Sequence, residues 1–426
     1  MRENLSYQQG LERMRSGDLD GAIESFARAI REVPRDIYAY NKLAFLYKEK
    51  RLFRKAGQVL AAALSVRADD YQTHYLLGNT HLAQGQYTQA VEAFKQALTL
   101  NPRDVYGWNS LALAHKLVRQ YDRALQCLDR AVELDPADAY NYNAKAVVLF
   151  CKGEYENGLE VLKAGLERSP GNALLEYSLG EAYLRLRQFQ KAEKCFAGLA
   201  EREPESKLGQ IGLGHLAVGQ GNWKKALTHF GKALDLDPRD WEVMAFCGEI
   251  HLDVGQLEQA EGFFARALKV NHRSSRASVG LGETHETQGL ILKAWQSYQL
   301  AVRANPSDPV ARFSLGRLYL EQKLPAKAVQ ELRTARHLDL VNDTYTAYLA
   351  LALCEVGSQD EGRRLFRQLL SAKPDHAFSL YHLARVLLEA DGKSEEGVSL
   401  LRTLGALKEN SEWKRLGREL SKARGL

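Results

Sequence analysis

Histidine is the residue type in this sequence that most often serves chemistry, and four of its eleven copies are regularly spaced. These four recur at 34 residues or a multiple of 34: His81, His115, His251 and His285. A spacing of 34 residues indicates a helical repeat. Successive copies of such a repeat stack about 10 Å apart, which is too far for one metal ion to bridge two of these rings. We therefore predict a structural role for these histidines and no metal site.

The cysteines form no redox or metal motif either. Cys127, Cys151, Cys195, Cys247 and Cys354 never make a CxxC pair, and an odd, scattered set fits a reducing compartment better than a disulfide framework. Cys247 and Cys354 each lie in a predicted helix, beside apolar residues. We expect both to be buried as small hydrophobic side chains.

Catalytic motifs are absent from the sequence. It has no GxSxG, no glycine-rich phosphate loop after a strand and no HExxH. We therefore expect no intrinsic enzyme activity and no cofactor. The net charge of +5 is spread over 426 residues, which is too weak to argue for nucleic acid or an anionic membrane as a partner.

Targeting signals and membrane spans are also not evident. The first residues, MRENLSYQQGLERM, hold no apolar stretch of the kind found in a secretory signal. The longest apolar runs, 59–64 and 144–151, are far too short to cross a membrane. We expect no membrane insertion and a cytoplasmic location.

Helices must position any functional surface, and their pattern recurs every 34 residues. Segment 85–104 reads as a glycine, an amphipathic helix and an Asn-Pro stop, and segments 119–138 and 221–240 repeat it. With Ala90 placed at position 20, the repeats start at residues 3, 37, 71, 105, 139, 173, 207, 241, 275, 309, 343 and 377. Only the last needs an extra residue. We predict one solenoid domain over 3–410 and a capping helix over 411–426.

Three columns of the repeat predict how its first helix (helix A) meets its second (helix B). Positions 8 and 20 hold only Gly or Ala, whereas position 24 holds Phe, Leu or Tyr. Small residues let two helices approach closely, so these columns mark the crossing. Proline at position 32 ends helix B in eight repeats, Gly at position 15 suits the turn in seven, and Asp, Asn or Ser at position 34 caps the next helix in ten.

This pattern resembles the tetratricopeptide repeat family over about nine-tenths of the chain. The family signature is Trp, Leu-Gly, Tyr, Ala, Phe, Ala and Pro. The third repeat matches it with His74, Leu77, Gly78, His81, Ala90, Phe94, Ala97 and Pro102, and the fourth supplies Trp108. The resemblance implies an all-α fold: a right-handed α-solenoid superhelix of about twelve helix pairs.

The resemblance also implies that positions 2, 5, 9 and 12 of helix A line a concave groove for extended or helical peptides. In repeats one to six this face is rich in Tyr and Asn: Tyr7, Tyr38, Asn41, Tyr75, Asn79, Tyr106, Asn109, Tyr140, Asn143 and Tyr177. Asn can both donate to and accept from a peptide backbone, and Tyr offers flat contact area with a polar tip. We predict a peptide-binding groove; the alternative is that these residues only fill a half-exposed surface.

Repeats eight and nine place acidic residues on the same face. They are Glu242, Glu249, Asp253, Glu283 and Glu286, against one basic residue, Arg276. A groove wall of one charge sign favours a basic ligand segment. The alternative is a solvated face or pairing within the chain.

We therefore predict a non-enzymatic scaffold that binds peptide segments of partner proteins and assembles a complex. One alternative is a non-catalytic targeting or regulatory subunit of an enzyme complex, such as a glycosyltransferase. A second is a single-stranded RNA binder, which the acidic repeats disfavour. Self-association through the ends of the solenoid is left open.

Overall fold

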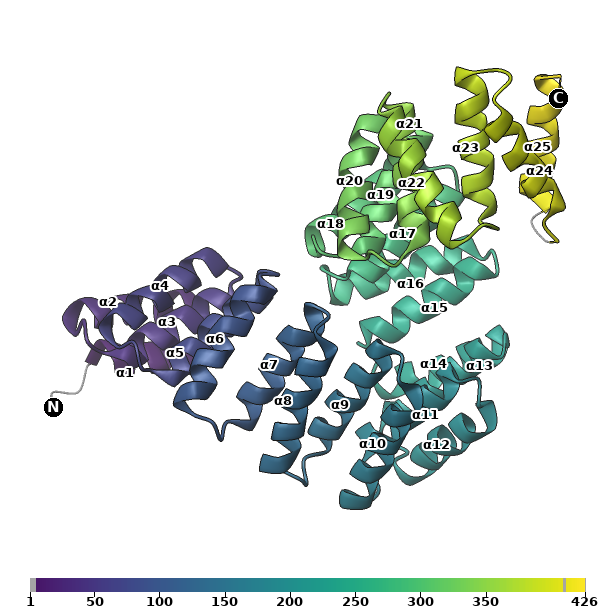
Figure 1. Cartoon of the computed structure of the whole chain (residues 1–426). Coiled ribbons are helices and arrows are strands. Elements are labelled where there is room, and N and C mark those ends of the chain that lie inside the picture. The colour runs from purple at the N-terminus through teal and green to yellow at the C-terminus, as the bar shows by residue number, and fades with distance from the viewer. Residues whose placement is uncertain (1–4, 409–410, 426) are drawn as a thin grey trace. The chain divides into compact units, whose positions relative to one another are not determined.

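The computed structural model describes residues 5–408 and 411–425, which form 25 helices and no β-strand (Figure 1). The outermost residues of the predicted solenoid (3, 4, 409 and 410) and of the predicted cap (426) lie outside this part of the chain. The helices are α1 Leu5–Arg15, α2 Leu19–Glu32, α3 Ile37–Glu49, α4 Phe53–Val66, α5 Tyr71–Ala83, α6 Tyr87–Leu100, α7 Val105–Leu117, α8 Tyr121–Leu134, α9 Ala139–Lys152, α10 Tyr155–Arg168, α11 Ala173–Arg185, α12 Phe189–Arg202, α13 Lys207–Gly219, α14 Trp223–Leu236, α15 Trp241–Asp253, α16 Leu257–Val270, α17 Ser275–Thr287, α18 Ile291–Ala304, α19 Pro309–Glu321, α20 Pro325–Leu338, α21 Asp343–Glu355, α22 Gln359–Ala372, α23 Ala377–Ala390, α24 Glu395–Ala406 and α25 Ser411–Ala423.

The predicted all-α fold of tandem helix pairs is confirmed. Odd-numbered helices up to α23 are the A helices and even-numbered helices are the B helices, and each A helix from α5 to α23 begins 34 residues after the previous one. Within a repeat the two helices pack together, as α5 does with α6 and α17 with α18. Each B helix then packs on the following A helix, as α6 does on α7.

The chain divides into two compact units, the first ending at Lys232 and the second starting at Ala233, inside α14. The first unit contains α1 to α13, and the second contains α15 to α25. A single solenoid domain over 3–410 therefore stays a prediction.

Size complementarity between positions 8 and 24 builds the contact between helices A and B. A Cβ atom at Gly78 would lie 2.6 Å from the Phe94 ring, and one at Gly282 would lie 2.4 Å from the Tyr298 ring. Because such distances are far below van der Waals contact, an aromatic ring at position 24 requires the missing Cβ in these repeats. Where position 8 is alanine, as in Ala112, the partner is usually leucine, here Leu128.

Helix starts follow the predicted capping pattern. Nine of the ten Asp, Asn or Ser residues at position 34 accept a hydrogen bond from a backbone N–H of the helix that follows. The exception is Asp104, which makes no such bond. His376 departs from the sequence pattern but caps α23 through Nδ1, which accepts from the Ser379 N–H at 3.3 Å.

The turn between helices A and B uses the left-handed backbone region. The seven glycines predicted at position 15 all have positive φ, between 73° and 94°. Among the first eleven repeats, the four without this glycine keep the same turn with a basic residue at φ 56° to 60°: Arg51, Arg119, Arg187 and Lys323. The turn geometry is therefore set by the packing of the two helices, since it persists where L side chains are disfavoured.

Candidate functional site

The predicted tyrosines divide into two groups according to their position in the repeat. Tyr38, Tyr106 and Tyr140, at position 2, are 62%, 76% and 54% exposed. The tyrosines at position 5 instead pack on the buried ring at position 24, with centroids 5.5 to 5.7 Å apart: Tyr7 on Phe26, Tyr75 on Phe94 and Tyr177 on Phe196. The position 2 tyrosines are thus open to a ligand, whereas the position 5 tyrosines belong largely to the core.

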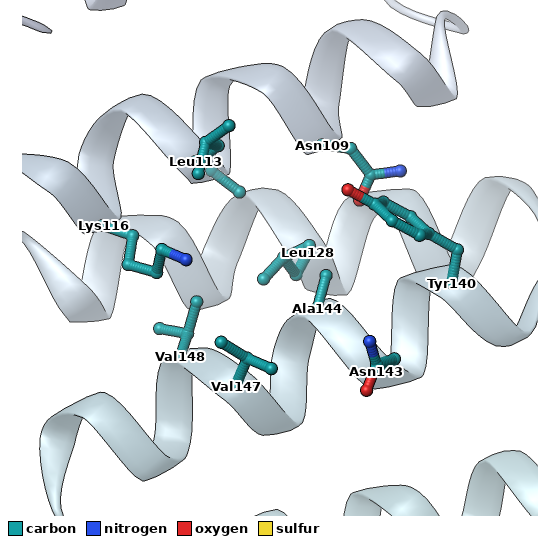
Figure 2. Close-up of a pocket in the computed structure, with 10 residues that line it drawn as sticks. Asn109, Leu113, Lys116, Leu128, Tyr140, Asn143, Ala144, Val147 and Val148 are labelled. Carbon is teal, nitrogen blue, oxygen red and sulfur yellow. The ribbon is translucent and has the colours of Figure 1, made fainter. Parts of the chain in front are cut away.

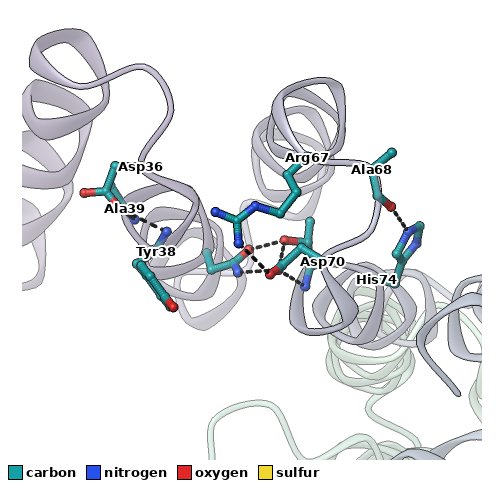
Figure 3. Close-up of polar contacts among 9 residues, drawn as sticks. Asp36, Tyr38, Ala39, Arg67, Ala68, Asp70 and His74 are labelled. Carbon is teal, nitrogen blue, oxygen red and sulfur yellow. Dashed lines mark hydrogen bonds and ion pairs between the residues drawn. The ribbon is translucent and has the colours of Figure 1, made fainter. Parts of the chain in front are cut away.

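Asn41 is engaged within the chain. It is buried on α3, and its Nδ2 donates to Asp70 Oδ2 at 3.2 Å. The Thr73 hydroxyl lies 2.9 Å from Asn41 Oδ1 and 2.6 Å from Asp70 Oδ2. Burial alone would raise the pKa of Asp70, but hydrogen bonds from Thr73 and Asn41 and the charge of Arg67 lower it below its usual value. Figure 3 shows Asp70 at the start of α5, near Arg67.

Asn109 also reaches the next A helix, but only through its amide nitrogen. Its Nδ2 donates to Asn141 Oδ1 at 2.8 Å, while its own Oδ1 is buried and accepts no hydrogen bond from the described residues. Asn143, one repeat later, likewise has a buried Oδ1 without a donor. Buried carbonyl oxygens of this kind are rare, because each forfeits the hydrogen bond it had in water.

Both asparagines line one pocket of about 200 Å³ between α7 and α9. Its other lining residues are Ala112, Leu113, Lys116, Leu128, Tyr140, Ala144, Val147 and Val148. Figure 2 shows Asn109 and Tyr140 near one end and Lys116 toward the other, with aliphatic side chains between them. The arrangement combines an apolar floor with the amide side chains of two asparagines, which is suited to an extended ligand that carries backbone polar groups.

Asn79 and Lys116 also lie on this face of the first unit. Asn79 is half-buried on α5. Lys116, at position 12 of the fourth repeat, was not among the predicted site residues, although the 34-residue register places it on the same face. Its spacing of seven residues from Asn109, about two helical turns, was the signal that could have identified it.

In the second unit, two of the five predicted acidic residues are paired within the chain. Glu249 forms a two-pronged ion pair with Arg276 at 2.5 and 2.6 Å. Glu286 forms one with Arg317 at 2.6 and 2.7 Å and also accepts from the Tyr298 hydroxyl at 2.6 Å. Pairing within the chain, the alternative interpretation of these repeats, thus accounts for Glu249 and Glu286. Arg317 stands at position 9, as Glu249 does, so the register could have revealed it.

The other three acidic residues make no ion pair among the described residues. Glu242 and Asp253 are exposed. Glu283 is half-buried and borders two hollows of about 310 and 420 Å³. Burial raises the pKa of Glu283, and the charges of Glu286, Glu249 and Asp253 act in the same direction against that of Arg317.

The regularly spaced histidines brace the turn that follows each A helix. Nδ1 of His81, His115 and His251 lies 2.6 to 2.8 Å from the side-chain oxygen of a glutamine five residues later. His285 lacks that glutamine and instead lies 3.3 Å from the Ser297 hydroxyl. These contacts support a structural role. Among the described residues, no three or more His, Cys, Asp or Glu side chains are grouped so as to hold a metal ion.

The cysteines are all free, and Cys247 and Cys354 are buried as predicted. Burial raises the pKa of Cys247 to about 12 and that of Cys354 to about 11, so both remain thiols at neutral pH. None of the described helices has the length and apolar character needed to cross a membrane.

Sequence models of the tetratricopeptide repeat match most of the chain. The matched residues are 7–73, 71–104, 105–138, 149–211, 217–279 and 296–343. No curated protein matches the sequence.

Several solved structures are similar to the chain. The crystal structure of the APC/C hetero-tetramer Cut9-Hcn1 matches with a TM-score of 0.52 at 14% identity, covering 100% of this chain and 96% of that one. The MamA protein matches with a TM-score of 0.38 at 20% identity, covering 41% and 96%. YrrB, described as a TPR protein with an unusual peptide-binding site, has a TM-score of 0.38 at 20% identity, covering 45% and 97%. At such identities the Cut9-Hcn1 likeness shows the fold alone, and the two weaker matches add nothing to it.

Proposed function

Because this chain belongs to the tetratricopeptide repeat family, whose members are generally non-catalytic scaffolds, we propose that it binds a peptide segment of a partner protein between α7 and α9. In this role it serves as a non-enzymatic scaffold for assembling a complex. Asn109 and Asn143 accept hydrogen bonds from the peptide backbone. The exposed Tyr106 and Tyr140 rings supply contact area, and Tyr38 and Asn79 extend the same face toward the N-terminus.

The observation that carries this proposal is one pocket lined by two asparagines, each of which has a buried and unsatisfied Oδ1. Asn109 Oδ1 and Asn143 Oδ1 both lack a donor among the described residues, and both residues line the space between α7 and α9. A peptide chain presents N–H groups regularly, so it can supply a donor to each amide once small side-chain movements expose the two oxygens. Each hydrogen bond completed in this way adds about 0.5–1.5 kcal/mol to binding.

The size of the pocket supports a peptide over a cofactor. Sites for drug-sized molecules and cofactors usually measure about 300–1,000 Å³. This pocket holds about 200 Å³, which suits one side chain of a longer ligand. Packing of the repeats also holds the lining residues in place, so the protein loses little conformational entropy on binding.

The test is selection of peptides from a display library on the full chain. We expect the selected peptides to bind at least about tenfold more weakly to Asn109→Ala/Asn143→Ala than to the wild type, because two hydrogen bonds are lost. The matched control is Asn157→Ala, which removes an exposed asparagine on α10. Selection of no peptide, or peptides that bind the double variant as tightly as the wild type, would contradict the proposal.

The same variants separate the alternatives. If a single-stranded RNA binds this face, its affinity will fall in Asn109→Ala/Asn143→Ala while no peptide is selected. If the protein is instead a targeting subunit of an enzyme, a catalytic partner should co-purify with it, and that association should depend on the same two asparagines.

A further inference from the structure

We infer that the bound segment carries a carboxylate, about three residues from the residue that meets Asn109, that pairs with Lys116, and an apolar side chain between these two points. This inference rests on the proposed function and specifies the class of peptide that the pocket selects: an acidic segment with one apolar anchor. Three features of the pocket support this inference: its apolar floor, the charge at its far end and the distance between its two ends.

The floor of the pocket is apolar and deep. Leu128 and Val148 are 1% and 3% exposed, and Ala112 and Ala144 are small residues that leave space between α7 and α9. Leu113 and Val147 form opposite walls, one turn beyond Asn109 and Asn143 respectively. An aliphatic side chain placed here removes its surface from water and meets no polar group on the floor, whereas a charged side chain would lose its hydration.

Lys116 is the cation that faces this space. It lines the pocket at the end away from Asn109 (Figure 2), and its ammonium group makes no ion pair within the described residues. The two lysines of α9 are each paired with an acid: Lys145 lies 2.6 Å from Asp129, and Lys152 lies 2.7 Å from Asp122. Among the described residues, Lys116 is the one charged residue that lines the pocket, so the charge there is positive and a carboxylate complements it.

The distance between the two ends sets the spacing of the motif. Asn109 and Lys116 are seven residues apart on one helix, which corresponds to roughly 10 Å along its axis. An extended peptide advances about 3.3 Å per residue. A peptide whose backbone N–H meets Asn109 Oδ1 therefore brings a side chain about three residues away to Lys116, with the apolar anchor between them.

A single cation also distinguishes this ligand from a nucleic acid. Backbone phosphates are bound through many basic contacts, and affinity then falls steeply as salt is raised. One lysine beside an apolar floor cannot supply those many basic contacts, but it can select one carboxylate in a peptide. The expected salt dependence of binding is accordingly shallow.

The experiment repeats the peptide selection on the full chain with Lys116→Glu, using Lys163→Glu as the matched control. Lys163 is an exposed lysine on α10 that does not line the pocket. Wild-type protein and the control should enrich peptides with an apolar residue and an Asp or Glu at constant spacing. Lys116→Glu should lose that acidic preference and enrich Lys or Arg at the same place.

Individual peptides then measure the pairing. Lys116→Glu should weaken an acidic peptide by about tenfold, and exchanging the peptide's acid for lysine should restore binding to this variant but not to the wild type. Peptides that depend on Asn109 and Asn143 but respond equally to Lys116→Glu and Lys163→Glu would overturn this inference and leave the proposed function standing. Peptides that ignore the two asparagines would overturn the proposed function itself.

Discussion

Asn109 donates a hydrogen bond from Nδ2 to Oδ1 of Asn141 across 2.8 Å, and this bond decides how the pocket asparagine is oriented. Asn141 is fully buried, and its own Nδ2 faces two backbone carbonyl oxygens, those of Ala131 at 3.2 Å and Asp135 at 3.1 Å. Its Oδ1 is thus the only side-chain atom that can meet Asn109, and it must accept. Asn109 therefore presents its NH₂ group to Asn141, and its Oδ1 is left without a donor.

The first prediction concerns Asn141 as a positioning residue. Asn141→Ala should lower the free energy of unfolding by about 1–3 kcal/mol, because the carbonyls of Ala131 and Asp135 lose their buried donor. It should also weaken peptide binding, since the Asn109 amide is no longer held in one orientation. Asn143→Ala, measured alongside by thermal melting and fluorescence anisotropy, should weaken binding without that loss of stability. Full affinity in Asn141→Ala would argue against the orienting role.

The second prediction tests the match between positions 8 and 24. Gly78→Ala should destabilise the protein by about 1–3 kcal/mol, because the added Cβ would lie 2.6 Å from the Phe94 ring. Adding Phe94→Leu recreates the pair found at Ala112 and Leu128 and should recover most of that loss. Urea denaturation of the four members of this cycle should give a coupling energy of about 1 kcal/mol or more. Additive effects would mean that the two positions do not determine each other.

The third prediction concerns the buried ion pair between Arg317 and Glu286. Their side chains are 24% and 16% exposed, so removing one partner leaves a poorly solvated charge. Arg317→Ala should cost about 3 kcal/mol, whereas Arg317→Met with Glu286→Gln should be nearly neutral, since Gln still accepts from Tyr298. Hydrogen exchange in α17 to α19 reports the local effect. Equal losses of stability in Arg317→Ala and in the double variant would show that the unpaired charge of Glu286 is not the cause of the loss.

The fourth prediction concerns His382 and acid stability. Burial lowers the pKa of His382 to about 3, with the charge of Arg385 acting in the same direction, and its ring lies 4.3 Å from that of Phe378. In the unfolded chain histidine titrates near 6.5, so the unfolded state binds more protons between pH 6.5 and 3. Stability should therefore fall as the pH drops through this window.

Replacing His382 by phenylalanine should reduce that pH dependence by up to about 1.4 kcal/mol per pH unit. The control is His272→Gln, which changes an exposed histidine and should leave the slope as in the wild type. Unfolding curves at pH 6.5 and 4.5 compare the two variants. A slope that His382→Phe does not change would mean that this ring takes up its proton in the folded state.

Much of the architecture could be predicted from the sequence because its determinants are local and periodic. The glycine at position 15, the cap at position 34 and the small residue at position 8 each act within a few residues or across one helix pair, so their spacing carries the information. The predicted groove face, however, includes both positions 2 and 5, whereas Tyr106 at position 2 is exposed and Tyr75 at position 5 is half-buried. Their difference depends on whether a ring such as Phe94 lies beneath the side chain.

The sequence alone determined that Asn41, Asn109 and Asn143 share position 5 of their repeats, since that follows from counting. Only the tertiary structure decided what each one does, because their partners stand 29 or 32 residues away, at the start of the next A helix. Thr73 and Asp70 engage both amide atoms of Asn41, while Asn141 takes only the nitrogen of Asn109. The equivalent residue for Asn143 is the buried Leu175, which offers no side-chain hydrogen bond. Whether a polar side chain is satisfied or left open to a ligand is thus settled by contacts between repeats.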